Sequence, residues 1–165
     1  MPYEQIDIRD IGNPVKLIAD NWALLSAGTA GDWNTMTVSW GGIGEIWGFD
    51  AAFAFVRPQR HTMKYMDANE YFTLAFGLPR ETLALCGKIS GRDCDKIAKA
   101  GLTAHAEGEA VWPEGAGLAI VCRKAAKQAI DPAGFIDPRI EENYNGDYHH
   151  MFVGEIVGVY RAIDS

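Results

Sequence analysis

Alternating apolar and polar residues predict a β-strand early in the chain. In the segment NTMTVSWGG, residues 34–42, apolar side chains alternate with hydroxyl side chains. A period of two is typical of a half-buried strand, so one face should reach a core. The hydroxyl groups on the other face, about 7 Å apart, would meet either solvent or a ligand. The apolar positions are Met36, Val38 and Trp40, and the hydroxyl positions are Thr35, Thr37 and Ser39.

Other strand-like segments recur along the chain and end at glycine or proline. We expect strands over residues 22–29, 51–58, 70–77, 116–130 and 149–162. The 116–130 segment also fits a helix, but its place among strands favours a strand. Gly154 and Gly158 indicate bulges or sharp bends in the last segment. Gly41, Gly42 and Gly44 are expected to form a loop or a close approach to another backbone.

Short helices are expected between these strands. Thr62 can cap a helix over 63–69, and a second helix over 80–87 would end at Gly87. The segment SGRDCDKIAKAG predicts a third, with Ser90 and Asp93 in a capping-box pattern and Gly101 at its end. Many short strands with few helices predict a mainly β fold, an antiparallel, Greek-key-like barrel with peripheral helices. No repeat or linker interrupts the sequence, so we expect a single domain over residues 1–165.

Charge and composition exclude several classes of protein. The net charge is −7 over 165 residues, whereas a nucleic-acid or membrane-surface protein usually has a basic face. No apolar run is long enough for a transmembrane helix, and the N-terminus does not resemble a signal peptide. We therefore expect no nucleic-acid partner, no membrane partner and a cytoplasmic location. Cys86, Cys94 and Cys122 are odd in number and form no C-x-x-C pair, so we expect free, buried thiols.

Two basic segments are candidates for binding an anion. RPQRHTMK, residues 57–64, follows a predicted strand and opens a predicted helix, where backbone N–H groups favour anions. The arginine forks in this segment suit phosphate, although a solvated basic loop fits equally well. SGRDCDK, residues 90–96, places Ser90 and Gly91 at a predicted helix start with Lys96 nearby. An ordinary N-cap is the alternative for the second segment.

Other kinds of site are not supported by the motifs. GGIGEIWG gives G-x-G-x-x-x-G, which is one residue longer than the dinucleotide-binding pattern, and no acidic residue follows at the expected place. The four histidines form neither H-x-x-x-H nor H-E-x-x-H, so no metal site is expected. No G-x-S-x-G occurs, so a Ser/His/Asp hydrolase is not indicated.

Taken in order, several segments resemble one known family. NTMTVSWGG, FAFVRPQRHTMKYM, YFTLAF, CGKISGRDCDKIAKAGLT and GDYHHMFVGEIVGVY occur in the order found in the flavin reductase-like family. That family has the FMN-binding split-barrel fold, and the chain looks most similar to its flavoredoxin-like branch. The resemblance extends from about Asn21 to Tyr160, and SGRD-x-DK and GDYH…GEI are its most specific parts.

The resemblance implies a cofactor, an activity and an assembly. It implies non-covalent FMN near the interface of a homodimer, with NAD(P)H as the co-substrate and electron donor. Electrons would pass through the flavin to a small-molecule or protein acceptor: free flavin, a ferric complex or a redox partner. The alternative is a non-catalytic FMN-binding, electron-transfer or sensor protein of the same fold. A flavin-free split barrel that binds another ligand is a third hypothesis.

The resemblance also implies site residues, because each can be matched to a family motif. The strand beside the flavin would contribute Asn34, Thr35, Met36, Thr37, Ser39 and Trp40. The phosphate and ribityl side would be bound by Arg57, Arg60, Thr62, Ser90, Gly91 and Lys96. His149 would lie near the flavin edge, and it is the one candidate for a catalytic residue, since the chemistry resides on the flavin. His150 stands where the family often has arginine, and LPRETLALCG is atypical, which leaves activity less supported than FMN binding.

Overall fold

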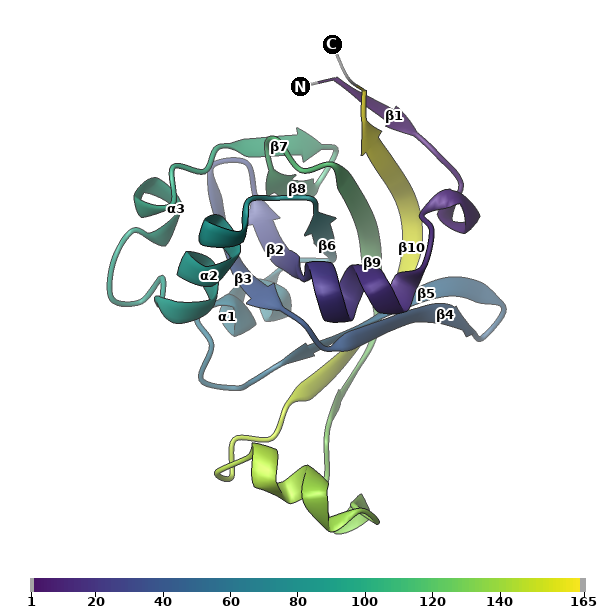
Figure 1. Ribbon diagram of the computed structural model, residues 1–165, viewed down its shortest axis with the longest axis vertical. Helices are drawn as coiled ribbons and strands as arrows, with labels where there is room; N and C mark the ends of the chain where they lie inside the picture. The colour runs from purple at the N-terminus through teal and green to yellow at the C-terminus, as the bar shows by residue number, and fades with distance from the viewer. Residues whose placement is uncertain (1, 164–165) are drawn as a thin grey trace.

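A curled antiparallel sheet of eight strands forms most of the molecule, and the computed structural model describes residues 2–163 of the chain (Figure 1). Along the sheet the order is β3-β2-β6-β9-β10-β5-β4, and β1 also pairs with β10. The strands are β1 (Tyr3–Gln5), β2 (Ala23–Thr29), β3 (Asp32–Val38), β4 (Gly41–Ile46), β5 (Phe49–Val56), β6 (Tyr71–Phe76), β9 (Leu118–Ala129) and β10 (His150–Ala162). A separate hairpin consists of β7 (Ala104–Glu107) and β8 (Ala110–Pro113). The predicted mainly β, antiparallel fold is confirmed.

The barrel is open between β3 and β4. These two strands follow each other in the sequence, yet they occupy opposite ends of the strand order. Among residues 2–163 these two strands are not hydrogen-bonded to each other as neighbours in the sheet. Strand β3 is therefore paired along one edge only, with β2. Ser39 and Trp40 alone connect the two strands across this opening. We call this opening the seam; it leaves one edge of β3 available for other contacts.

The first half of strand β9, residues 118–122, is buried on both faces, which explains why its sequence does not alternate there. Leu118, Ile120 and Cys122 point into the main core of the barrel. Ala119 and Val121 lie on the opposite face, in a second apolar cluster with Trp112 of β8. A strand covered on both sides has a continuous apolar run, which cannot be told from a helix by periodicity. The expectation of a strand over 116–130 is confirmed.

The helices lie beside β2 and β3, and their boundaries differ from the predictions (Figure 1). They are α1 (Thr62–Ala68), α2 (Arg80–Lys88) and α3 (Lys96–Lys99). The predicted cap at Thr62 is wrong, because its hydroxyl accepts a hydrogen bond from Asn34 inside the protein. The predicted helix over residues 90–101 is also wrong at its start. Asp95 caps the short α3 by accepting from the N–H of Ala98, and residues 89–95 form turns.

Glycines have two distinct roles in the sheet. The expected loop at Gly41–Gly44 is wrong, since these residues belong to β4 and pair with β5. The expected close backbone approach is found at Gly41, where an added Cβ would lie 2.8 Å from the carbonyl oxygen of Phe53. Irregularities in the β9–β10 pairing occur at Val153/Gly154 and Ile156/Gly158, as predicted for the two glycines of β10.

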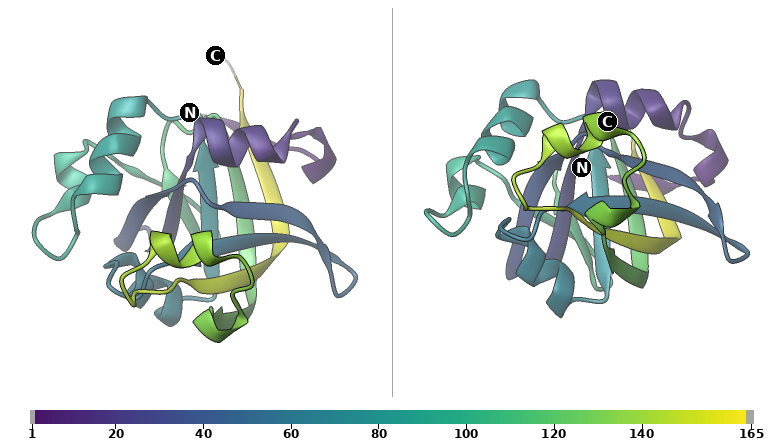
Figure 2. Two further views of the ribbon diagram at one scale, coloured as in Figure 1. Left: turned by 60° about the horizontal axis from the view of Figure 1, so that its bottom comes forward. Right: turned by 90° about the horizontal axis from the view of Figure 1, so that it is seen from below.

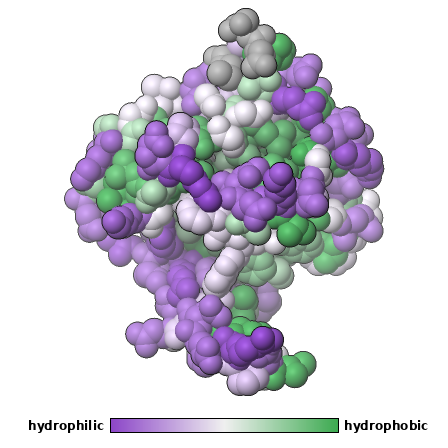
Figure 3. Space-filling model, in the orientation of Figure 1, coloured by the Kyte–Doolittle hydropathy of each residue, from purple (hydrophilic) through white to green (hydrophobic). Residues whose placement is uncertain are grey.

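A long connecting segment between β9 and β10 projects from one end of the barrel. It comprises residues 130–149 and carries two 3₁₀ helices, Pro132–Gly134 and Pro138–Asn143. We call it the arm; it is the light green segment below the barrel in Figure 1, and it comes forward in both views of Figure 2. On the face shown in Figure 3 it is mostly hydrophilic, with hydrophobic atoms near its far end. The arm was not predicted as a separate feature.

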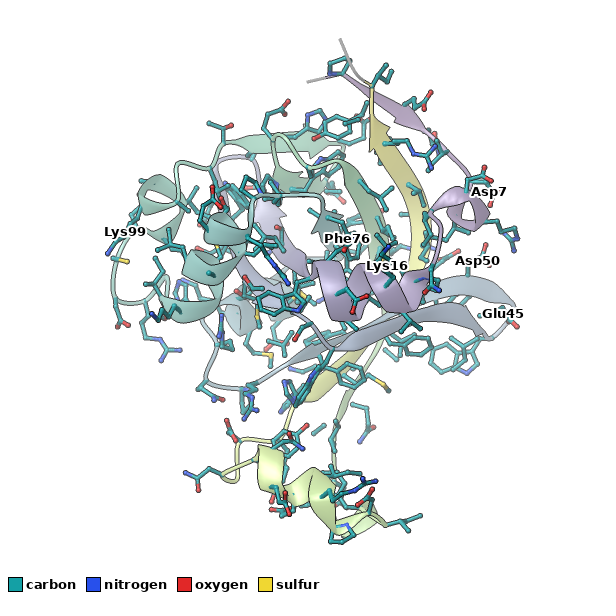
Figure 4. The ribbon with its side chains drawn as sticks, viewed as in Figure 1. Asp7, Lys16, Glu45, Asp50, Phe76 and Lys99 are labelled. Atoms are coloured by element: carbon teal, nitrogen blue, oxygen red, sulfur yellow. The ribbon has the colours of Figure 1, made fainter. Side chains whose placement is uncertain are left out.

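The N-terminal segment crosses the front of the barrel. It contains a 3₁₀ turn, Ile8–Asp10, and a π-helix, Lys16–Asn21, whose Ile18 packs against Gly41. Figure 4 shows Phe76 inside the barrel and Lys16, Glu45 and Lys99 on its outside. No helix among residues 2–163 has the length and apolar character needed to cross a membrane.

We predict that Gly154→Ala destabilises the fold by about 1–3 kcal/mol, as overpacking of a core does. The new Cβ would lie 2.6 Å from ring atoms of Phe72 and 2.7 Å from Cβ of Cys122. Urea unfolding measures this loss against Gly44→Ala, a strand glycine whose Cβ would meet nothing within 4 Å. Equal stability of the two variants would contradict the packing described for β10.

Candidate functional site

Two cavities lie along β3 on the side of the seam. The first, of about 560 Å³, is lined by residues from the β2–β3 turn, α1 and the segment 91–98. The second, of about 190 Å³, is lined by the end of β3 and by side chains from β5, the 57–61 loop and the arm. The first includes Asn34, His61, Tyr65, Gly91 and Lys96. The second includes Met36, Thr37, Ser39, Trp40, Phe55, Arg57, Arg60 and His149.

Two cations converge on one carbonyl oxygen between these cavities. Lys96, only 2% exposed, donates from Nζ to the carbonyl oxygen of Cys86 at 3.4 Å. Arg60 donates to the same oxygen at 3.3 Å and to the carbonyl oxygen of Gly87 at 3.1 Å. These carbonyls belong to the last turn of α2, whose partial negative charge favours cations. Among the described residues neither cation forms an ion pair with a carboxylate.

The pKa values of basic groups in this region are lowered. Desolvation, with repulsion from Arg60 as the next cause, lowers the pKa of Lys96 to about 8. Burial lowers the pKa of Arg60 as well, followed by repulsion from Arg57. The pKa of His61 is lowered by burial and then by Lys64, Arg92 and Lys96. An anion placed beside Lys96 and Arg60 would relieve a cost that backbone carbonyls only partly offset.

The hydroxyl face of β3 is used mainly by the protein itself. Thr35 is fully buried, accepts from the hydroxyl of Ser26 at 2.9 Å and donates to the carbonyl of Leu25. Thr37 donates to the carbonyl oxygen of Leu83 in α2, although its side chain also lines the second cavity. The hydroxyls of Thr35 and Thr37 therefore bind neither solvent nor a ligand as their main partner, because both form hydrogen bonds within the protein.

The 90–96 segment closes tightly over β3. An added Cβ at Gly91 would lie 2.8 Å from both Oδ1 of Asn34 and Cδ2 of His61, so glycine is required for this approach. Ser90 accepts from the N–H of Arg92, and its side chain is not part of either cavity wall. Thr62 and Thr35 are likewise outside both walls. The other predicted residues are divided between the cavities, with Asn34, Gly91 and Lys96 in the first and Met36, Thr37, Ser39, Trp40, Arg57, Arg60 and His149 in the second.

Arg57 is already paired, in contrast to Arg60. Its Nη1 lies 2.5 Å from Oδ2 of Asp147, and its Nη2 donates to the carbonyl of Asn143 at 2.9 Å. The guanidinium carbon also lies 5.0 Å from the ring centre of Tyr144. Hydrogen bonds from the backbone N–H of Asn145, then from Arg57 and Gln59, hold the pKa of Asp147 well below its usual range. Arg57 thus fastens the arm to the barrel.

His149 lies at the base of the arm and forms part of the second cavity. It is 8% exposed, and its Nδ1 is 2.8 Å from the hydroxyl oxygen of Tyr144. Burial and then repulsion from Arg57 lower the pKa of His149 to about 4, so the ring is neutral at physiological pH. Trp40, 47% exposed, lies 5.3 Å from the histidine ring and provides an apolar wall.

Sequence reasoning missed the arm residues that complete this region. Asp147 is 90 positions from Arg57, and Tyr144 lies in a segment without helical or strand periodicity. The only available indication was the density of aromatic residues just before His149. The expected burial of all thiols is wrong for Cys94, which is partly exposed and lines the first cavity, whereas Cys86 and Cys122 are buried.

The donor set suits an organic anion better than a metal ion. Lys96 and Arg60 offer cationic N–H donors, which match phosphate oxygens. The adjoining cavity combines the apolar side chains of Met36, Trp40 and Phe55 with hydroxyl and charged groups, so it could contact both a planar ring and its polar edge. No group of three histidine, cysteine or acidic residues suited to a metal occurs within residues 2–163.

Comparisons with known proteins establish the fold. No protein-family model matches the chain, and no curated protein matches its sequence. Flavoredoxin from Methanosarcina acetivorans is similar in structure, with a TM-score of 0.68 and 20% identity over 96% of this chain and 76% of that one. Flavoredoxin of Desulfovibrio vulgaris (Miyazaki F) gives 0.66 and 19% over 98% and 76%. An FMN-binding domain of a flavin reductases-like enzyme from Shewanella baltica gives 0.68 and 14% over 97% and 77%. The predicted resemblance to split-barrel flavoproteins is confirmed at the level of the fold.

We predict that Lys96 makes stability rise with pH between about 8 and its ordinary pKa of 10.5. In this window the unfolded chain still binds the proton that the folded chain has lost, so raising the pH favours folding, here by about 1–3 kcal/mol. Urea unfolding at pH 7.5 and pH 10 should show that Lys96→Met loses part of this rise.

Lys99→Met is the matched control, because Lys99 is on the same short helix but exposed at the edge of the molecule (Figure 4). It should keep the pH dependence of the wild type. If the Lys96→Met and wild-type curves ran parallel, Lys96 would not be a desolvated cation in the folded chain.

Proposed function

We propose that this chain is an FMN-binding flavoprotein oxidoreductase that transfers electrons from NAD(P)H through the flavin to a second acceptor. The observation that carries the proposal is the pair of cations beside β3, the buried Lys96 and the half-buried Arg60. Their positive charges lack carboxylate partners among the described residues, and a phosphate group would supply the missing negative charge. The split-barrel fold, shared with proteins described as FMN-binding, supports the same cofactor.

Each part of the flavin has candidate partners on this chain. Arg60 and Lys96 would bind the phosphate, and Gly91 would allow the backbone to approach it. The apolar lining of Met36, Trp40 and Phe55 would contact the planar ring. Bound FMN would supply the hydride chemistry, while the protein supplies position, electrostatics and exclusion of water. The unpaired edge of β3 and Ser39 would offer polar groups to the ring.

The remaining parts of the proposal concern the setting of the reaction. We propose a homodimer, with the seam near the interface between subunits, and a cytoplasmic location. Support for an interface comes from exposed apolar side chains at the seam and on the arm, namely Trp40 and Ile136. The acceptor is proposed to be free flavin, a ferric complex or a redox partner.

We predict that the purified chain binds FMN and that the flavin bleaches when NADH or NADPH is added without oxygen. We also predict that Lys96→Met weakens FMN binding roughly 10- to 100-fold, because a charge-assisted hydrogen bond to phosphate is lost. Riboflavin lacks the phosphate, so its weaker affinity should hardly change in this variant. Fluorescence titrations with both flavins measure the difference.

Lys99→Met again serves as the control and should leave both affinities unchanged. A protein that binds neither flavin, or a Lys96→Met variant that weakens riboflavin as much as FMN, would contradict the proposed phosphate site. Flavin that binds but is reduced by neither nicotinamide would instead identify an electron-transfer or sensor protein.

A further inference from the structure

The contact between Tyr144 and His149 is not explained by cofactor binding alone. The hydroxyl oxygen of Tyr144 lies 2.8 Å from Nδ1 of His149. The histidine ring also has Trp40 at 5.3 Å, Phe55 at 6.3 Å and the Tyr144 ring at 5.4 Å. Three aromatic neighbours and a hydrogen bond hold the imidazole in one orientation.

Donor and acceptor strengths decide which tautomer this contact favours. Burial raises the pKa of Tyr144, so its phenol keeps its proton, and the imidazole is neutral. If Tyr144 donates to Nδ1, the single imidazole proton must be on Nε2. If Nδ1 donated instead, the phenol proton would need another acceptor, and Tyr144 has no second hydrogen bond within residues 2–163. Each arrangement leaves one proton without an acceptor among the described residues, the Nε2 proton in the first and the phenol proton in the second. The first is favoured because a phenol is a stronger hydrogen-bond donor than a neutral imidazole N–H, and an imidazole nitrogen is a stronger acceptor than a phenol oxygen.

The other ring nitrogen then becomes a donor in the second cavity. Nε2 of His149 makes no hydrogen bond among the residues that the structure describes, and it is not among the fully buried atoms that lack a partner. The ring itself lines the second cavity. Because this donor carries no charge, it suits a neutral acceptor, such as a carbonyl oxygen or an unprotonated ring nitrogen.

Arg57 keeps Tyr144 in place. Its two hydrogen bonds reach Asn143 and Asp147, on either side of Tyr144 in the sequence, and its guanidinium stacks on the tyrosine ring. The arm is thus fastened where it delivers the tyrosine hydroxyl. Arg57 therefore has a carboxylate partner, whereas Arg60 and Lys96 form no ion pair among residues 2–163.

We propose that Tyr144 is a positioning residue that fixes His149 as an Nε2–H donor, through which the second cavity recognises a neutral acceptor edge of a planar ligand. Under the proposed function, on which this assignment of the ligand rests, that edge belongs to the flavin ring. The site would then recognise two chemistries: an anion through Arg60 and Lys96, and a neutral acceptor through His149.

Nitrogen NMR of the flavin-free protein tests the tautomer directly. In protein labelled with ¹⁵N, His149 should show an acceptor-type Nδ1 and a protonated Nε2 from pH 5.5 to pH 8. Arg57, Arg60, Asp147 and Tyr144 are the charged and titratable groups around it. Tyr144→Phe should give a mixture of tautomers, with the folded spectrum otherwise retained.

Tyr148→Phe is the matched control, because Tyr148 lies in the same arm but its hydroxyl donates to Glu141. It should leave the His149 tautomer unchanged. A protonated Nδ1 in the wild type, or an unchanged tautomer in Tyr144→Phe, would overturn the proposal.

A flavin titration tests recognition separately. Tyr144→Phe should weaken FMN about three- to tenfold, and His149→Ala about tenfold, as expected for one hydrogen bond. His149→Gln, which keeps a neutral N–H donor, should stay within about threefold of the wild type. Unchanged affinity in both Tyr144→Phe and His149→Ala would overturn the recognition role. A wild type that does not bind FMN would refute the proposed function, while the NMR result would still decide the role of Tyr144.

Discussion

Two like charges, the buried Lys96 and the half-buried Arg60, lie against one carbonyl oxygen beside β3, and much of the local structure follows from this. The ammonium of Lys96 and the guanidinium of Arg60 both donate to Cys86, and neither has a carboxylate partner among residues 2–163. The C-terminal carbonyls of α2 offset part of their desolvation cost. Such an arrangement costs stability unless something else compensates for it, so it is more readily explained by binding than by folding.

Polar residues around this pair are divided between structure and binding. Asn34 donates to Thr62 at 2.8 Å, and Thr35 bonds to Ser26 and Leu25, so these groups support the sheet and α1. Arg57 and Asp147 fasten the arm. Once these partners are assigned, the two cations and Nε2 of His149 remain with capacity for a ligand. Because of the seam, the edge of β3 beside them is not paired with another strand.

Local sequence patterns predicted the strands better than they predicted the site. Alternation and flanking glycines identify β3, β5 and β6 because each of these strands has its own periodicity or clear ends. The helix expected at Ser90 fails, because Ser90 caps only a turn and Asp95 begins the helix. Gly41–Gly44 read as a loop because glycine hides the alternation of β4. The partners of Arg57 and His149 lie in the arm, whose sequence has neither helical nor strand periodicity. Arg57 is also far from its partners along the chain. Most of the residues named from the family resemblance line the two cavities beside β3, but the resemblance did not separate paired from unpaired side chains.

The most direct measurement is a crystal structure of the chain grown with FMN. It should show phosphate oxygens within hydrogen-bond distance of Nζ of Lys96 and the guanidinium of Arg60, with the flavin ring along the open edge of β3. A structure in which the phosphate lies elsewhere, while Lys96 and Arg60 still bind only the carbonyls of α2, would contradict the assignment of this pair as the anion site.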